Sequence, residues 1–102
     1  MKEITLKELQ TAIAAIDHKN HAADQYFYKL AEEVGEIAKA IRKGRRLESC
    51  GGIKGTVEEE LYDVLYYTVC LANILEIDLT ACAALKEKLN AEKYGRKCIF
   101  DV

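Results

Sequence analysis

The chain has 102 residues, of which 50% are hydrophobic and 31% charged, so it can form a packed core and lacks the composition of a disordered protein. Its formal net charge of -2 excludes the strong basic excess with which proteins bind long stretches of DNA or RNA. A single nucleotide is compatible with this charge, because a divalent cation can lie between an acidic site and an anionic ligand.

The first predicted helix begins after Thr5 and runs from about Leu6 to Asp17. Thr5 followed by Glu8 is typical of a capping box, in which each side chain accepts a hydrogen bond from the other residue's backbone N–H. Apolar residues then recur at helical spacing: Ile4, Leu6, Leu9, Ile13 and Ile16. The polar segment 18–21 (His18-Lys19-Asn20-His21) ends this helix, and its two histidines either close the helix or contact a substrate.

A second predicted helix follows and extends to Gly44, with an apolar stripe formed by Phe27, Leu30, Val34, Ile37 and Ile41. Residues 45–55 contain three glycines and a serine, so we expect a mobile loop over about 44–55. Basic residues flank this loop and either complement the negative end of the helix dipole or close over an anionic substrate. They are Arg42, Lys43, Arg45 and Arg46.

The third predicted helix starts near Val57, because Thr56 followed by Glu59 repeats the capping-box pattern. Apolar residues lie nearly all round this helix over 61–75, so it should be buried on several sides. A domain this small buries only about two-thirds of its unfolded surface, and we therefore expect the helix to lie near a homo-oligomer interface. The alternative is a central helix that its own chain covers completely.

Asp78 is a candidate N-cap for a fourth helix, which should stop before Gly95. The chain contains no proline and no convincing strand. These patterns predict a single all-α domain over residues 1–102, built as a four-helix bundle.

Five carboxylates on the second and third predicted helices form two sets. Glu32, Glu33 and Glu36 are three or four residues apart and share one sector of their helix. Glu60 and Asp63 are three residues apart, and Asp63 interrupts an apolar run, where an unpaired carboxylate is costly. If the two helices pack antiparallel, the two sets can face each other and supply the oxygen ligands that Mg²⁺ prefers.

The carboxylates have two other interpretations. Glutamates on a helix face usually pair with basic residues or meet water, and we expect this of Glu58 and Glu59. A di-iron site requires Glu-x-x-His on two helices, and neither His18 nor His21 follows a glutamate at that spacing. The spacing therefore favours a magnesium site over a di-iron site.

Residues 30–37 and 60–64 resemble the two halves of the Glu-Glu-x-x-Glu … Glu-x-x-Asp signature of MazG-like nucleotide pyrophosphohydrolases. Lys86 followed by 90–94 (Asn-Ala-Glu-Lys-Tyr) is similar to a third motif of that family. The resemblance covers the second to fourth predicted helices. It implies the all-α NTP pyrophosphatase fold, a homodimer or dimer of dimers, and Mg²⁺-dependent cleavage of a nucleoside triphosphate to monophosphate and pyrophosphate, with Mn²⁺ as an alternative metal.

The same resemblance implies roles for individual residues. The principal metal ligands would be Glu33, Glu36, Glu60 and Asp63. Glu32 would complete the catalytic set with Glu33 and Glu36, by joining a second metal or by orienting and deprotonating the attacking water. The substrate would be contacted by Lys86, Asn90, Lys93 and Tyr94.

Aromatic residues are the remaining candidates for substrate binding. Tyr67 lies one turn beyond Asp63, where it can stack on the substrate or simply pack. The chain has no tryptophan, which some family members use to sandwich the base, so Tyr26, Phe27 or Tyr28 would serve instead or belong to the core.

Two alternative functions stay open: a related phosphoanhydride hydrolase such as a phosphoribosyl-ATP pyrophosphatase, and a non-catalytic helical module that binds a nucleotide or a protein.

The N-terminus lacks the apolar segment of a secretory signal, and the four cysteines are widely spaced. The longest apolar stretch is too short to cross a bilayer and contains Asp63. We therefore expect a cytoplasmic protein that binds neither membranes nor nucleic-acid polymers.

Overall fold

The computed structural model describes residues 1–18 and 21–100. Four α-helices follow in chain order: α1 (Leu6–Ile16), α2 (Ala23–Arg42), α3 (Val57–Ile74) and α4 (Leu79–Tyr94). A short 3-10 helix, η1 (Leu47–Ser49), lies between α2 and α3. The described residues include no strand, so the predicted all-α class with four helices is confirmed. Of the polar segment predicted to separate the first two helices, Lys19 and Asn20 lie outside the described residues.

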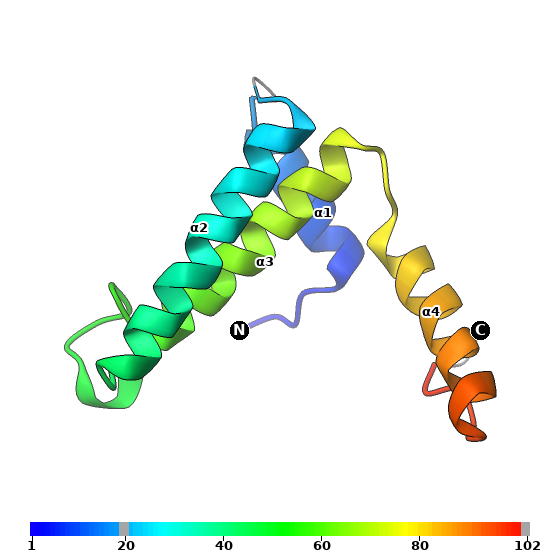
Figure 1. Cartoon of the computed structure of the whole chain (residues 1–102). Helices are drawn as coiled ribbons and strands as arrows, with labels where there is room; N and C mark the ends of the chain where they lie inside the picture. The colour runs from blue at the N-terminus through cyan, green and yellow to red at the C-terminus, as the bar shows by residue number, and fades with distance from the viewer. Residues whose placement is uncertain (19–20, 101–102) are drawn as a thin grey trace.

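The helices α2 and α3 lie side by side and run antiparallel, and α1 packs against α3 (Figure 1). A small core forms where the three helices meet. It contains Ile13 of α1, Tyr26 of α2, and Val69 and Cys70 of α3, all of them buried. The predicted antiparallel arrangement, on which the meeting of the two carboxylate sets depends, is therefore confirmed.

The two predicted capping boxes differ in the structure. At α1, Glu8 N donates to Thr5 Oγ1 (3.0 Å) and Thr5 N donates to Glu8 Oε1 (3.1 Å), as predicted. At α3, Glu59 N donates to Thr56 Oγ1 (3.2 Å), but the Glu59 carboxylate accepts from Gly55 N (2.8 Å) instead of Thr56 N. The prediction of a second complete capping box is therefore wrong. The Thr56 N–H does not donate to Glu59, because it already donates to Ile53 O in the preceding turn.

The loop between α2 and α3 is held by side chains at its two ends. Arg46 Nε donates to Glu58 Oε2 (2.8 Å), and Leu47 N donates to Glu58 Oε1 (3.0 Å). Arg45 Nε donates to Gly55 O (3.1 Å). Glu58 thus pairs with a basic residue as expected, and the predicted mobility of the loop stays a prediction.

The fourth helix begins and ends where the sequence predicts. The Asp78 carboxylate accepts from the backbone N–H groups of Thr80 (3.0 Å) and Ala81 (3.4 Å), and Gly95 ends the helix with φ of 62° in the left-handed region. However, α4 extends away from the α2–α3 pair and contacts chiefly α1 (Figure 1). The four helices do not close into one bundle within a single chain.

Gln10 of α1 fixes the turn that sends α4 outward. Its amide nitrogen donates to Asn73 Oδ1 (3.0 Å) and Ile77 O (2.9 Å), and its amide oxygen accepts from Leu79 N (2.9 Å). Glu76 in the same turn has φ of 58°. The chain bends by 101° between α3 and α4.

Large apolar side chains stay exposed on every described α-helix, among them Ile16 of α1, Val34 and Ile41 of α2, Leu61, Tyr62 and Leu65 of α3, and Leu85 and Leu89 of α4. The alternative in which the chain covers α3 completely is therefore wrong. The predicted homo-oligomer interface stays a prediction.

None of the described helices is long and apolar enough to cross a bilayer by itself; α3 and α4 reach that length and composition only when joined across their bend.

Candidate metal centre

The antiparallel α2–α3 pair brings three carboxylates together. One oxygen each from Glu33, Glu60 and Asp63 lies within 4.8 Å of the other two, and all three residues are half-buried. A set made only of carboxylate oxygens is the donor chemistry that Mg²⁺ and Mn²⁺ prefer. The residues present therefore fit the predicted metal.

The electrostatics of the cluster also favour a cation. Burial, a hydrogen bond with Glu33 and the charges of Glu33 and Asp63 raise the pKa of Glu60 to about 7. Burial and the charges of Glu33 and Glu59 raise the pKa of Asp63, against an opposing effect of Lys54. Bound protons or a divalent cation would relieve this repulsion, and the cation would leave all three carboxylates ionised.

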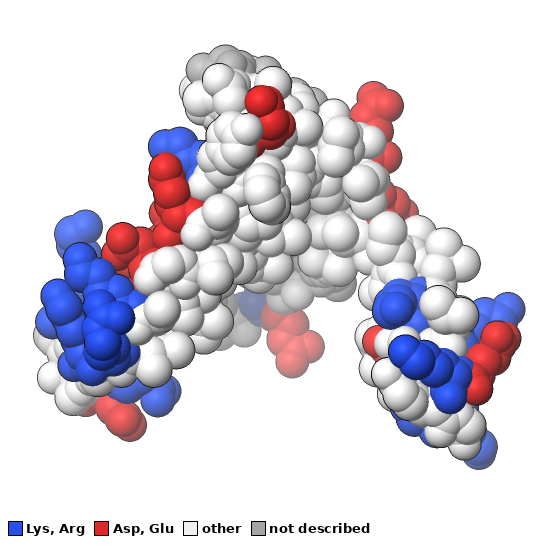
Figure 2. Space-filling model, viewed as in Figure 1, with Lys and Arg blue, Asp and Glu red and all other residues white. Residues whose placement is uncertain are grey.

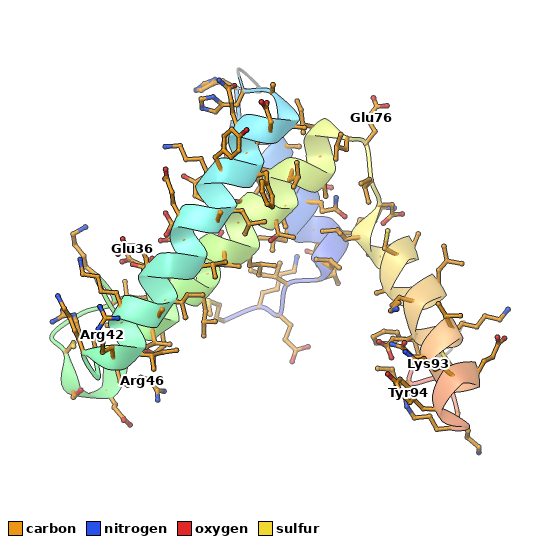
Figure 3. The ribbon with its side chains drawn as sticks, viewed as in Figure 1. Glu36, Arg42, Arg46, Glu76, Lys93 and Tyr94 are labelled. Carbon is orange, nitrogen blue, oxygen red and sulfur yellow. The ribbon has the colours of Figure 1, made fainter. Side chains whose placement is uncertain are left out.

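The other two predicted carboxylates lie at the edge of this cluster. Glu36 is exposed on the side of α2 away from α4 (Figure 3), and it lines a pocket together with Glu60. Glu32 is also exposed; the pKa of Tyr67 is raised chiefly by burial, then by the charges of Glu33 and Asp63, and least by Glu32. The structure thus gathers three of the four predicted metal ligands, with Glu36 and Glu32 beside them.

A basic pocket of about 180 Å³ adjoins the cluster where α2 ends and α3 begins. It is lined by Glu36, Lys39, Ala40, Lys43, Arg45, Gly55 and Glu60. Lysine and arginine side chains gather at this end of the molecule, beside acidic groups (Figure 2). Glu60 belongs to both the carboxylate cluster and the basic pocket, so the two are continuous.

An aromatic pocket of about 320 Å³ lies between the end of α1 and the second half of α3. Its lining residues are Ile16, Asp17, His18, His21, Tyr26, Tyr66, Tyr67 and Cys70. The buried Tyr26 hydroxyl donates to the two Asp17 carboxylate oxygens, at 2.7 and 2.6 Å. Tyr67 is one turn from Asp63 on α3, so this pocket begins next to the carboxylate cluster.

The family follows from the part of the chain that builds this site. Residues 22–94 match the model of the MazG nucleotide pyrophosphohydrolase domain, and they include all five carboxylates. The chain belongs to the MazG nucleotide pyrophosphohydrolase family. The predicted resemblance is therefore confirmed.

Solved structures give the same result for this MazG chain. Two crystal structures of iMazG from Vibrio DAT 722, described as Ctag-iMazG and Ntag-iMazG, are 46% identical to it. Ctag-iMazG matches with a TM-score of 0.75, covering 85% of this chain and 98% of its own. Ntag-iMazG matches with a TM-score of 0.76, covering 91% and 100%.

A curated relative is the uncharacterized protein YpjD of Bacillus subtilis (strain 168). It is 33% identical over 87 residues, which cover 78% of this chain and 77% of the relative. The all-α fold and the nucleotide pyrophosphohydrolase family of the MazG chain thus rest on both sequence and structure.

The predicted substrate residues on α4 of this MazG domain lie apart from the carboxylate cluster. Lys86, Lys93 and Tyr94 are exposed, whereas Asn90 is half-buried and its amide donates to Glu87 Oε2 (3.1 Å). Figure 3 shows Lys93 and Tyr94 near the end of α4, far from Glu36 across the molecule. Within one chain, α4 does not bring these residues to the acidic site.

The candidate base-binding aromatics divide between pocket and surface. Tyr26 and Tyr67 line the aromatic pocket, whereas Phe27 and Tyr28 are 54% and 59% exposed and lie outside its lining. Sequence reasoning missed Tyr66 and Cys70, which are three and seven residues beyond Asp63 on α3. Extending the helical spacing of the carboxylates by two turns would have found them.

Proposed function

We propose that this MazG domain is a Mg²⁺-dependent nucleoside triphosphate pyrophosphohydrolase, cleaving ribo- or deoxyribonucleoside triphosphates to monophosphate and pyrophosphate in the cytoplasm. The observation that carries the proposal is the convergence of Glu33, Glu60 and Asp63 oxygens within 4.8 Å, between a basic and an aromatic pocket. A triphosphate needs a cationic region and a base needs an aromatic one, and both adjoin the carboxylates.

In this mechanism Glu33, Glu60 and Asp63 would hold the metal, with Glu36 as a further ligand at the edge of the cluster. A bound Mg²⁺ lowers the pKa of water and neutralises phosphate oxygens. Glu32, exposed beside the cluster, accepts the proton of the attacking water or contributes to a second metal. The water oxygen bonds to the α-phosphorus, the bond from that phosphorus to the α–β bridging oxygen breaks, and pyrophosphate leaves with the bridging oxygen and the electron pair of the broken bond.

The base is assigned to the aromatic pocket. Tyr67 stands between this pocket and the carboxylates, so it can stack on the base or donate a hydrogen bond to the substrate. His18 and His21, which the sequence leaves between helix closure and substrate contact, both line this pocket. An aromatic ring and polar imidazoles suit a planar heterocycle.

We further propose that the protein is a homodimer or a dimer of dimers in which α4 serves a neighbouring copy. Leu85 and Leu89 of α4 are 70% and 55% exposed, and Leu61 of α3 is 55% exposed. Burial of such side chains is the main source of stability in homo-oligomers. Docking of α4 on a second copy would bring its polar residues to that copy's site: Lys86, Asn90, Lys93 and Tyr94.

The direct test is pyrophosphate release from a panel of canonical and modified triphosphates with Mg²⁺. We expect one pyrophosphate for each monophosphate formed, no turnover with EDTA, and a large loss of kcat in Glu36→Gln. Glu48→Gln, in the exposed η1 turn, is the matched control. Absence of turnover with every triphosphate, or full activity of Glu36→Gln, contradicts the proposal.

The same panel separates the two alternatives. Turnover of phosphoribosyl-ATP in preference to the triphosphates would identify the related phosphoanhydride hydrolase. Calorimetric binding of nucleotides without any hydrolysis would identify a non-catalytic binding module.

A further inference from the structure

We propose that the basic pocket formed by Lys39, Lys43 and Arg45 binds the β- and γ-phosphates of the substrate and holds the pyrophosphate after cleavage. The inference rests on the proposed function and adds to it the place and the ligands of the leaving group. The residues concerned lie outside the carboxylate signature and outside the motif on α4.

Lys39 and Lys43 carry positive charges that no ion pair within the described residues neutralises. Lys39 and Lys43 are four residues apart at the end of α2, so their side chains share one face, and both line the pocket. Neither forms an ion pair with a carboxylate of residues 1–18 or 21–100. Like charges at this spacing repel each other, and a bound anion would offset that repulsion.

The loop holds Arg45, which also lines the pocket. Its Nε donates to Gly55 O (3.1 Å), and one terminal nitrogen donates to Lys54 O (3.5 Å). Gly55 has φ of 77°, and a Cβ at this position would lie 3.3 Å from Arg45 Nε. The glycine therefore lets the guanidinium lie close to the backbone, and the fork of five N–H donors retains others for phosphate oxygens.

The helix dipole alone does not explain this arrangement. Cations near the end of α2 do complement its negative pole, but of the two in the last turn, Lys39 and Arg42, only Lys39 lines the pocket. Lys43 and Arg45 lie beyond the last turn, around a hollow. Arg46 is already paired with Glu58 at 2.8 Å and is not in the lining, so proximity to the loop does not by itself place a cation there.

The order of groups along α3 sets the direction of the substrate. Glu60 lines the basic pocket, Asp63 follows in the carboxylate cluster, and Tyr67 follows in the aromatic pocket, at helical intervals of three and four. The carboxylate cluster is the centre of this series. The α-phosphate belongs at the cluster, because the proposed reaction cleaves the bond at the α-phosphorus. A base among the aromatic residues then places the β- and γ-phosphates in the basic pocket.

The test is equilibrium binding of inorganic pyrophosphate with Mg²⁺ to the full chain, measured by calorimetry with orthophosphate as the comparison ligand. Losing a charge-assisted contact weakens binding by about tenfold or more. We expect such a rise in the pyrophosphate Kd for Lys39→Gln and for Lys43→Gln, and a larger rise for the double variant. Arg42→Gln removes a cation from the same helix end but not from the pocket, and should change Kd less than about twofold.

Three outcomes overturn the inference: no pyrophosphate binding by the wild-type chain, orthophosphate binding as tight as pyrophosphate binding, or equal effects of Arg42→Gln and Lys43→Gln. Circular dichroism of each variant separates a binding loss from misfolding, and Lys43→Arg, which keeps the charge, should retain most of the affinity. Failure of this inference is distinguishable from failure of the proposed function. If the pocket assignment fails alone, triphosphate turnover persists while the lysine variants bind pyrophosphate normally.

Discussion

The α2–α3 pair and α4 obey the same rules of helix formation but differ in what their functional side chains meet. In the pair, Glu33 from one helix and Glu60 and Asp63 from the other converge within 4.8 Å. On α4, the residues of the third motif lie apart from this cluster, because the helix projects from the body (Figure 1). The difference indicates that one chain completes the carboxylate part of the predicted site; that the α4 part depends on assembly is our proposal.

The largest expected effect tests the half that one chain completes. Asp63→Asn removes a ligand while keeping the side chain's size, and we expect kcat/KM to fall by at least about 100-fold, since even partners outside the ligand shell contribute 10–100-fold. The apo variant should unfold at the same temperature or higher, because one of three repelling charges is gone. Steady-state kinetics and thermal unfolding check both effects; a twofold loss of activity would contradict the ligand assignment.

The next prediction tests the half that depends on assembly. The Asp63→Asn variant has a damaged carboxylate cluster and an intact α4, whereas the Lys86→Ala/Asn90→Ala variant has an intact cluster and a damaged α4. Each variant alone should therefore be nearly inactive. Mixed in equal amounts and allowed to exchange, they should recover about a quarter of wild-type activity, because half of random dimers are mixed and each contains one intact site. If mixing restores nothing while exchange is verified by mass spectrometry, α4 does not act across subunits.

A smaller effect is expected at the junction of the two regions. Gln10→Ala removes three hydrogen bonds that fix the turn before α4. Each is worth about 0.5–1.5 kcal/mol net, with the lower end for partly exposed groups, so we expect a loss of about 1–2 kcal/mol in unfolding free energy. Thr11→Ala, on the next residue of α1, removes only a local bond to Lys7 O and serves as the control. Equal urea midpoints for the two variants would contradict the role of Gln10.

The smallest effect is the pH dependence of the apo protein. The pKa of Glu60 is about 7 in the folded state, above its ordinary value of 4.5, so the folded state binds more protons in that window. Stability from this group is present below pH 4.5 and is lost as pH rises through about 7. We expect the loss to stay below about 1 kcal/mol, because the site is open to solvent.

Mg²⁺ should reverse this trend, since the metal competes with protons for the same carboxylates and binds more tightly at higher pH. Thermal unfolding between pH 5 and 8, with EDTA or Mg²⁺, measures both slopes. In EDTA, the unfolding temperature of Glu60→Gln should depend less on pH than that of the wild type. An unchanged pH dependence in that variant would assign the effect to another group.

Most helix ends and the carboxylate cluster of the α2–α3 pair were predictable, because the signals that define them are local. The Thr5–Glu8 box, the Asp78 cap and Gly95 mark helix ends within a few residues of the chain. Carboxylates at intervals of three and four define one face of each helix, and a single connecting loop then makes antiparallel packing the simple arrangement. These facts were enough to predict that Glu33, Glu60 and Asp63 meet.

The features that escaped prediction depend on contacts between distant residues. The outward direction of α4 depends on Gln10, whose partners are 63–69 residues away along the chain, and no periodicity encodes that contact. Asp17 was predicted as a helix end, but its role in the aromatic pocket follows from Tyr26, which is buried against it. Lys39 was not distinguished from other surface lysines because its pocket exists only where the α2–α3 loop folds back.

The turn held by Gln10 has a consequence for the geometry of the whole assembly. If each α4 serves the neighbouring copy, the bend of 101° between α3 and α4 sets the spacing and relative orientation of two active sites. Symmetry repeats any change of that bend in every subunit. In that assembly Gln10, a residue of α1 outside the carboxylate cluster and both flanking pockets, would determine whether neighbouring sites can be complete at the same time.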